Sequence, residues 1–116
     1  MRYLLMLFAD EKIGASFPPE EMAKAMELMH AYSDTLRKAG AFVDTAGLAP
    51  TWDAKTVGLE EGDMKVHDGP YAETREQLGG YFIIEAETMD KAVDFAIQCP
   101  ACEWGKIEIR PYAPKG

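Results

Sequence analysis

The sequence predicts an α+β fold: a ferredoxin-like sandwich in which an antiparallel sheet carries two helices on one face. The first observation is the order of the apolar patterns, which alternate between strand and helix spacing as β-α-β-hairpin-β-α-β. The second is the length of 116 residues, which suits one domain, 1–116, with a single core. The third is that no internal repeat, linker or low-complexity tract marks a second domain.

The first two elements have the clearest patterns. Residues 2–9 are apolar at consecutive positions, which is typical of a strand buried on both faces. Residues 17–40 then have the end signals of a helix, because Pro19 suits the first helical position and Gly40 favours the left-handed stop. The predicted apolar stripe of this helix consists of Met22, Met26, Met29 and Leu36.

The middle of the chain predicts two strands with a hairpin between them. Residues 41–49 form the second strand, and residues 56–69 form a hairpin with Glu61-Gly62-Asp63 near its tip. Residues 79–87 follow as a strand with four consecutive apolar residues.

The C-terminal part predicts a helix and a last strand. Thr88 suits the N-cap of a helix over residues 88–100, and Pro100 ends it. The apolar stripe of this helix is Met89, Ala92, Val93, Ala96 and Ile97. Residues 106–112 alternate as a half-buried strand, with Ile107 and Ile109 on one side and Lys106, Glu108 and Arg110 on the other.

Two helices cover only one face of this sheet, yet residues 2–9 and 79–87 are apolar on both faces. The second face would be a large exposed apolar patch unless something covers it. A second copy of the chain is the simplest cover. The sequence therefore predicts a homodimer.

Charge and composition exclude several partners. The formal net charge is −8, which repels phosphate backbones and anionic lipid surfaces, so we expect neither direct nucleic-acid binding nor membrane binding. The apolar run over residues 3–9 is too short to span a membrane, and the small-residue cleavage site of a secretory signal is absent. The expected location is the cytoplasm.

The stretch from His67 to Arg75 contains most of the reactive side chains, namely His67, Asp68, Glu73 and Arg75. A histidine and a carboxylate can transfer protons near neutral pH, and an arginine can bind a carboxylate substrate. Asp68-Gly69-Pro70 is equally typical of a tight turn, in which the aspartate caps backbone N–H groups. We predict that the stretch is both a turn and one wall of a pocket, towards which Arg110 also points.

Two further candidates lie on or beside the helices. His30 falls on the flank of the first helix, where histidine is either a solvated side chain or a proton shuttle. Cys99 and Cys102 form a C-x-x-C, but the pair follows a helix C-terminus, where the dipole disfavours thiolate. One such pair is also only half of a zinc site, so neither a redox role nor a metal is expected.

The stretch "HDGPYAETREQLGGYFIIE" resembles the YCII-related family, in particular the branch with an Asp-Gly-Pro-Phe motif, here with Tyr71 in place of Phe. The resemblance implies a ferredoxin-like fold that dimerises into an α+β barrel. It also implies a catalytic His–Asp pair, with His30 close to the family histidine. The family aspartate belongs where this chain has Cys99-Pro100, so Asp68 would have to replace it.

Two functions follow as expectations. The first is acid–base chemistry without a cofactor or metal, as in a lyase, isomerase or dehydratase acting on a small, anionic molecule; one family member acts in chloroaromatic breakdown. Its catalytic residues would be His67, Asp68, Glu73 and His30, and its substrate-binding residues Arg75, Tyr71 and Arg110. The alternative is a non-catalytic ligand-binding or accessory module linked to sigma-factor-dependent transcription, which the resemblance implies from the genes that accompany this branch.

Overall fold

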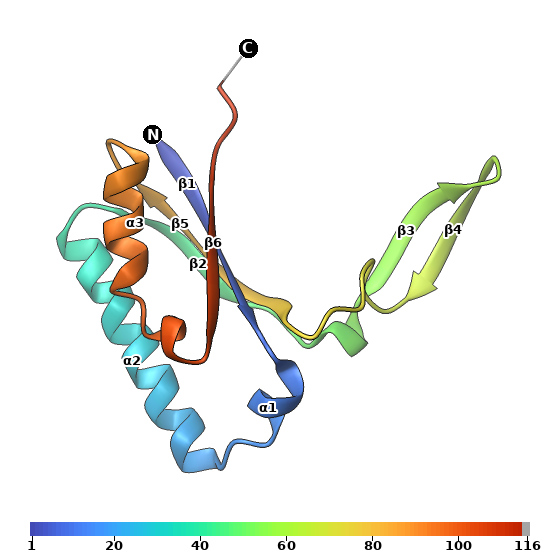
Figure 1. Ribbon diagram of the computed structural model, residues 1–116, viewed down its shortest axis with the longest axis horizontal. Coiled ribbons are helices and arrows are strands. Elements are labelled where there is room, and N and C mark those ends of the chain that lie inside the picture. The colour runs from blue at the N-terminus through green and yellow to red at the C-terminus, as the bar shows by residue number, and fades with distance from the viewer. Residues whose placement is uncertain (115–116) are drawn as a thin grey trace.

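The structure is a computed structural model that describes residues 1–114. It contains six β-strands, three α-helices and two short 3₁₀ helices (Figure 1). In chain order they are β1 Arg2–Ala9, α1 Glu11–Ala15, α2 Pro19–Lys38, β2 Phe42–Gly47, η1 Thr51–Asp53, β3 Lys55–Glu60, β4 Asp63–Asp68, β5 Gln77–Glu85, α3 Met89–Ile97, η2 Pro100–Glu103 and β6 Gly105–Pro111.

Four of the strands form one antiparallel sheet in the order β2-β5-β1-β6. With the hairpin β3–β4 left aside, this order and the two helical crossovers are those of a ferredoxin-like α+β fold. Strand β1 lies in the interior of the sheet, where its Leu5 pairs with Phe82 on one side and with Ile109 on the other. The predicted fold class is therefore consistent with the structure.

The core lies between this sheet and the helices α2 and α3. Its buried members from the sheet are Tyr3, Leu5, Phe82 and Ile84, and those from the helices are Tyr32, Leu36, Ala92 and Ala96. Ile107 and Ile109 of β6 also pack against this cluster, as the alternation of their strand predicts. Both helices thus cover the same face of the sheet.

The predicted apolar stripes of the helices are only partly right. On α2, Leu36 is fully buried, but Met22 and Met26 are 39% and 50% exposed. The reason is length: α2 has 20 residues and α3 has 9, so at 1.5 Å per residue α2 runs about 15 Å beyond its neighbour. On α3, Met89, Val93 and Ile97 are exposed, and Phe95 packs against the core instead.

The other face of the sheet is open. Leu4, Met6, Tyr81 and Ile83 point to it and are only half-buried, and register places Leu4 beside Ile83 and Met6 beside Tyr81. Glu108 and Arg110 of β6 lie beside them and are exposed. We refer to this surface as the open face.

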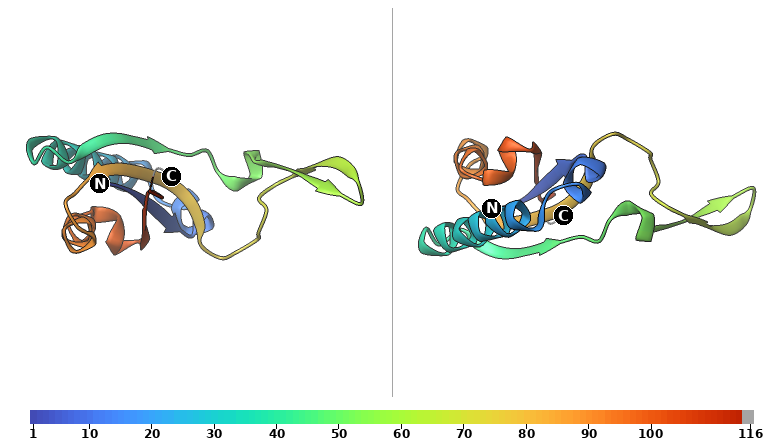
Figure 2. Two further views of the ribbon diagram at one scale, coloured as in Figure 1. Left: turned by 90° about the horizontal axis from the view of Figure 1, so that it is seen from above. Right: turned by 90° about the horizontal axis from the view of Figure 1, so that it is seen from below.

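The hairpin β3–β4 is a separate two-stranded sheet that extends away from the rest of the molecule (Figures 1 and 2). Its two strands pair from Lys55–Asp68 at the base to Glu60–Asp63 at the tip. The tip turns at Glu61 and Gly62, which have φ values of 50° and 85°. The hairpin and its tip agree with the sequence prediction, but its separation from the sheet does not follow from the sequence pattern.

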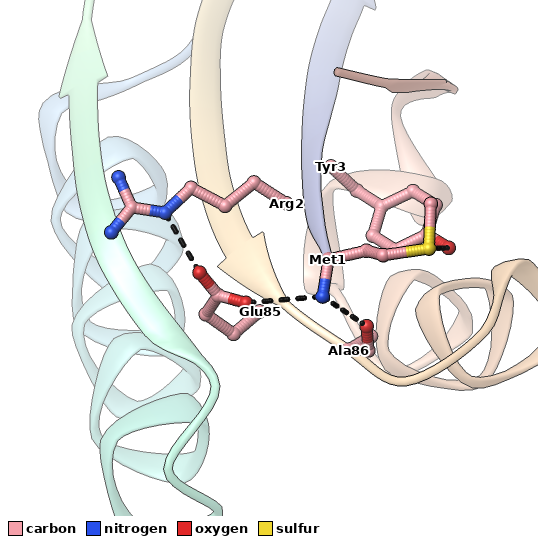
Figure 3. A network of polar contacts seen from close by, with 5 residues as sticks. All are labelled: Met1, Arg2, Tyr3, Glu85 and Ala86. Carbon is pink, nitrogen blue, oxygen red and sulfur yellow. Dashed lines mark hydrogen bonds and ion pairs between the residues drawn. The ribbon is translucent and has the colours of Figure 1, made fainter. Parts of the chain in front are cut away.

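Polar contacts hold the start of β1 to the end of β5 (Figure 3). Arg2 Nε donates a hydrogen bond of 2.7 Å to Glu85, and the amino group of Met1 lies 3.3 Å from the same carboxylate. The Met1 amino group also donates to the carbonyl oxygen of Ala86. The hydrogen bond from Arg2 is the main reason why the pKa of Glu85 is lowered below its usual value.

Candidate functional site

An apolar concavity lies between the N-terminal half of α2, the helix α1 and the helix-covered face of the sheet. It is a half-open groove of about 680 Å³. It exists because α2 extends past α3, so that among residues 1–114 no second long helix lies beside this half of α2. Side chains that line it include Phe17, Met22, Met26, Met29, Phe82 and Trp104. A concavity of this size lined mainly by apolar side chains is typical of small-molecule sites.

Few polar side chains reach this apolar groove, and most of them are already bonded. Ser33 donates to the carbonyl oxygen of Met29 at 3.3 Å, and Thr45 donates to that of Tyr81 at 2.8 Å. His30 also lines the groove, and among residues 1–114 no hydrogen bond or ion pair includes its side chain. His30 is therefore free to bond to a ligand.

A second, more polar cavity of about 700 Å³ adjoins the groove, and we refer to it as the vestibule. The two share Asp10, Glu11, Trp52 and Gln77 in their walls. The vestibule is further lined by Lys12, Thr51, Gly69, Pro70, Glu73, Thr74 and Arg75. A ligand can therefore place an apolar part in the groove and a polar part in the vestibule.

The short helix α1 positions the shared wall. Asp10 caps this helix, because its carboxylate accepts hydrogen bonds from the backbone N–H groups of Lys12 and Ile13 at 3.0 and 3.4 Å. Glu11 accepts a backbone bond of 2.8 Å and a hydroxyl bond of 2.6 Å from Thr51. These contacts tie the end of β1 to η1, so the wall is held from two distant parts of the chain.

Of the residues in the predicted loop, Glu73 and Arg75 line the vestibule. Arg75 Nε lies 3.5 Å from Asp10 Oδ2, and the arginine side chain is 85% exposed. Gly69, Pro70 and Thr74 of the same stretch also line the vestibule. Tyr71 points away, at 93% exposed, and Arg110 lies on the open face, apart from both cavities.

His67 and Asp68 do not belong to either cavity, contrary to the prediction that they gather with Glu73 and Arg75. They are adjacent in strand β4, so their side chains point to opposite faces of the hairpin. His67 Nε2 lies 3.0 Å from a carboxylate oxygen of Glu60, and Asp68 pairs with Lys55. Both pairs are exposed to solvent.

The role assigned to Asp68 in the turn was also wrong. The side chain bonds to Lys55 and not to backbone N–H groups. The chain reverses at Gly69 instead, which has a φ of 95° and donates its N–H to the carbonyl oxygen of Ala54 at 2.7 Å. Thr56 adds a hydroxyl bond to the carbonyl oxygen of Gly69. Glycine is favoured here because the left-handed region disfavours a side chain.

The cysteine pair lies beside η2. Cys99 is buried, and burial raises the pKa of its thiol to about 11, so the thiolate form is scarce at neutral pH. Cys102 is exposed and its Sγ donates to the carbonyl oxygen of Ala96 at 3.4 Å. Among residues 1–114, no group of three His, Cys, Asp or Glu side chains lies close enough to hold a metal ion.

Sequence comparison places the chain in a known family. The model of the YCII-related domain matches residues 1–115. The chain belongs to the YCII-related family. A YCII-related relative from Rhizobium meliloti (strain 1021), described as an uncharacterized protein, is 34% identical over 115 residues, which cover 97% of this chain and 93% of the relative.

No His–Asp pair is formed among residues 1–114 of this YCII-related chain. His30 lines the groove without a carboxylate partner among residues 1–114, and the position expected for the aspartate is Cys99-Pro100, whose thiol is buried. The sequence did not single out Asp10, Glu11, Trp52 or Trp104, which line the cavities. The sequence signal that could have found this wall is Asp10, because it is a good helix cap directly after an apolar strand. None of the helices in residues 1–114 is long and apolar enough to cross a membrane.

Proposed function

We propose that this YCII-related protein binds a small, mainly apolar molecule in the groove, with the polar end of the molecule in the vestibule. The observation that carries this proposal is the adjacency of an apolar groove of about 680 Å³ and a polar cavity that shares its wall. The apolar part contributes affinity through burial, and the few polar groups orient the ligand.

The charges around the vestibule favour a particular polar end. Asp10, Glu11 and Glu73 supply three carboxylates, whereas Lys12 and Arg75 supply two cations. The lining is thus slightly negative, so a hydroxyl, amide or amine group is favoured over a multiply charged anion. A single carboxylate is accepted only where Arg75 turns from Asp10 towards the ligand, which its exposure allows.

A fluorescent probe tests binding in the groove. N-phenyl-1-naphthylamine, which is apolar and neutral, should bind with enhanced fluorescence, and Met26→Glu should weaken that binding about tenfold or more. Leu28→Glu is the matched control, because Leu28 lies on the same helix, is also 50% exposed and does not line the groove. Equal binding by both variants, or no binding by the parent chain, would contradict the proposal.

A second candidate function is proton transfer to or from the bound molecule by His30, without a cofactor. It is favoured by the position of His30 in the groove wall and by the lack of a hydrogen-bond or ion-pair partner for its imidazole among residues 1–114. Imidazole is the side chain best suited to give and accept protons near neutral pH. Asp68 and His67 are not part of this proposal, because they lie on the hairpin.

Nuclear magnetic resonance can test this role, because the chain has only two histidines. We expect 1-naphthol, whose hydroxyl carries a proton, to shift the titration midpoint of the His30 ring by at least half a pH unit. The ring of His67 is the internal control and should titrate unchanged. If the titration of His30 does not change when 1-naphthol is added, the protein binds the molecule without proton transfer by His30.

We also propose that the open face pairs with that of a second copy and forms the α+β barrel. The half-buried apolar side chains of Leu4, Met6, Tyr81 and Ile83 support this pairing. Light scattering at micromolar concentration should then give twice the chain mass of 12.9 kDa. A monomer under these conditions would contradict the barrel.

A further inference from the structure

The hairpin β3–β4 has one apolar and one polar face. Cross-strand pairs place Val57 beside Val66 and Leu59 beside Met64, all on the same side. These four side chains are 61–70% exposed, although they form a continuous apolar surface. The opposite side carries polar pairs such as Thr56 with His67 and Glu60 with Asp63. We refer to the hairpin as the arm and to the four side chains as its apolar face.

The described part of the chain does not cover the apolar face of the arm. Among residues 1–114, no hydrogen bond or ion pair links β3 or β4 to another strand or helix, and the arm extends freely in both views of Figure 2. An isolated two-stranded hairpin is marginally stable in water, and exposed apolar strands promote association. Another molecule must therefore supply the surface that the apolar face needs.

We infer that the arm lies across the mouth of the groove of a second copy, so that each ligand site is closed by the arm of the partner. This inference extends the proposed function and rests on it for the presence of a ligand in the groove. The contact between the arm and the groove itself requires no ligand. The rim of the groove matches the arm, because it exposes Met22, Met26, Leu48 and Trp52 and these side chains carry no charge.

The position of the arm in the chain makes a reciprocal contact possible. Its base joins Trp52 of η1 and Pro70, which line the vestibule of its own chain. Each strand has six residues, so the tip lies about 20 Å from that base. When the arms of two copies lie antiparallel and a two-fold axis passes between them at mid-length, the tip of each arm reaches the groove of the partner.

Area and charge both favour a second copy. The apolar face supplies on the order of 400 Å², and two reciprocal contacts, in which each chain gives one arm and one groove, reach about the 800 Å² per partner of a specific interface. Each chain has a charge of −8, so long-range electrostatic attraction cannot drive the association. Apolar contacts such as those of the arm are required.

Disulfide trapping between two different chains tests the contact directly. In a Cys102→Ser background, which removes the exposed native thiol, one chain carries Leu59→Cys on the arm and the other carries Met26→Cys on the groove rim. An equimolar mixture should give a cross-linked heterodimer under mild oxidation. In the control mixture, Lys65→Cys on the polar face of the arm replaces Leu59→Cys and should cross-link at least tenfold less.

A second measurement does not depend on cysteine chemistry. Met64→Lys should weaken self-association by at least tenfold in sedimentation experiments, whereas Asp63→Asn should leave it unchanged. Both changes raise the net charge by one on adjacent residues of opposite faces, so charge repulsion cannot explain a difference. Both sites lie on the exposed arm, so the fold of the body is unaffected.

The two measurements decide between the outcomes. Absence of the heterodimer, equal cross-linking from both faces of the arm, or unchanged association of Met64→Lys would overturn the inference even if the naphthylamine probe binds. Selective cross-linking together with failure of the probe to bind would support the arm contact and contradict the proposed ligand site instead.

Discussion

At the scale of single residues, Tyr32 connects three elements of the core. Its hydroxyl donates a hydrogen bond of 2.7 Å from α2 to the carbonyl oxygen of Phe95 on α3. Its ring meets that of Phe82 on β5 edge-on, with 5.2 Å between the centroids. Burial is the main cause that raises the pKa of this phenol, so the hydroxyl stays a donor.

We predict that Tyr32→Phe lowers the free energy of unfolding by about 1 kcal/mol, because it leaves a part-buried carbonyl without its donor. Denaturant unfolding measures this change. Tyr81→Phe is the control, since its hydroxyl bonds to the exposed Asp44 and its loss should cost less than about 0.5 kcal/mol. Equal effects of the two substitutions would show that the bond to Phe95 contributes nothing specific.

Cys99 predicts a dependence of stability on pH. Its thiol titrates at about 11 in the folded chain against 9.0 for the free group. The unfolded chain therefore loses this proton first, so stability is complete below pH 9 and is lost as the pH rises towards 11. We predict that the stability difference between the parent chain and Cys99→Ala shrinks by up to about 2 kcal/mol between pH 8 and pH 10.5.

Denaturant unfolding at the two pH values checks the prediction for Cys99, because other titrating groups cancel in the difference. A stability difference that stays constant would mean that the thiol is not shielded from water. At pH 8, a thiol reagent should also modify Cys102 in the folded chain and leave Cys99 unmodified, since only Cys102 is exposed.

At the scale of elements, α2 has a structural half and a site half. Leu36 near its C-terminus is fully buried, whereas Met26 near its N-terminus is half-exposed and lines the groove. We predict that Leu36→Ala lowers the free energy of unfolding by roughly 2–5 kcal/mol and that Met26→Ala changes it by less than about 0.5 kcal/mol. Thermal or denaturant unfolding distinguishes them, and a large cost at Met26 would place the core boundary elsewhere.

Local sequence signals predicted where the elements begin and end better than they predicted what the elements pack against. The ends of α2 and the tip of the hairpin depend on residues such as Pro19, Gly40 and Gly62, whose backbone preferences act without distant contacts. The helix α1 was missed, because its five residues are too few for an apolar period, and only the cap at Asp10 marks it. Alternation within β4 already separates His67 from Asp68, so this pair was a poor choice for joint catalysis.

The groove was not predictable in the same way. It results from the different lengths of α2 and α3 on one sheet face, and that relation exists only once the helices are packed side by side. The exposure of Met22 and Met26 has the same cause. A helical stripe of methionines indicates which face turns inward, but it cannot show how far the neighbouring helix extends over that face.

At the scale of the whole molecule, the arm makes the chain unusually extended. Its radius of gyration is 16.2 Å, whereas a compact chain of this length has about 13 Å. We predict that replacing residues 57–66 by Asn-Gly, a dipeptide that favours the hairpin turn, lowers the radius of gyration of the monomer towards that compact value. Small-angle scattering, extrapolated to a dilution at which the monomer predominates, measures it, and an unchanged radius would mean that the arm folds back in solution.

The arm contact that we propose also makes the local order of the arm depend on the protein concentration. In that contact, a hairpin that is marginal alone gains stability from the second copy, so mass action links its backbone hydrogen bonds to the chain concentration. On dilution, its amides exchange with solvent and its peptide bonds become open to proteases, while the amides of β1 and β5 stay protected. The lifetime of the folded hairpin in a cell then depends on the abundance of the protein.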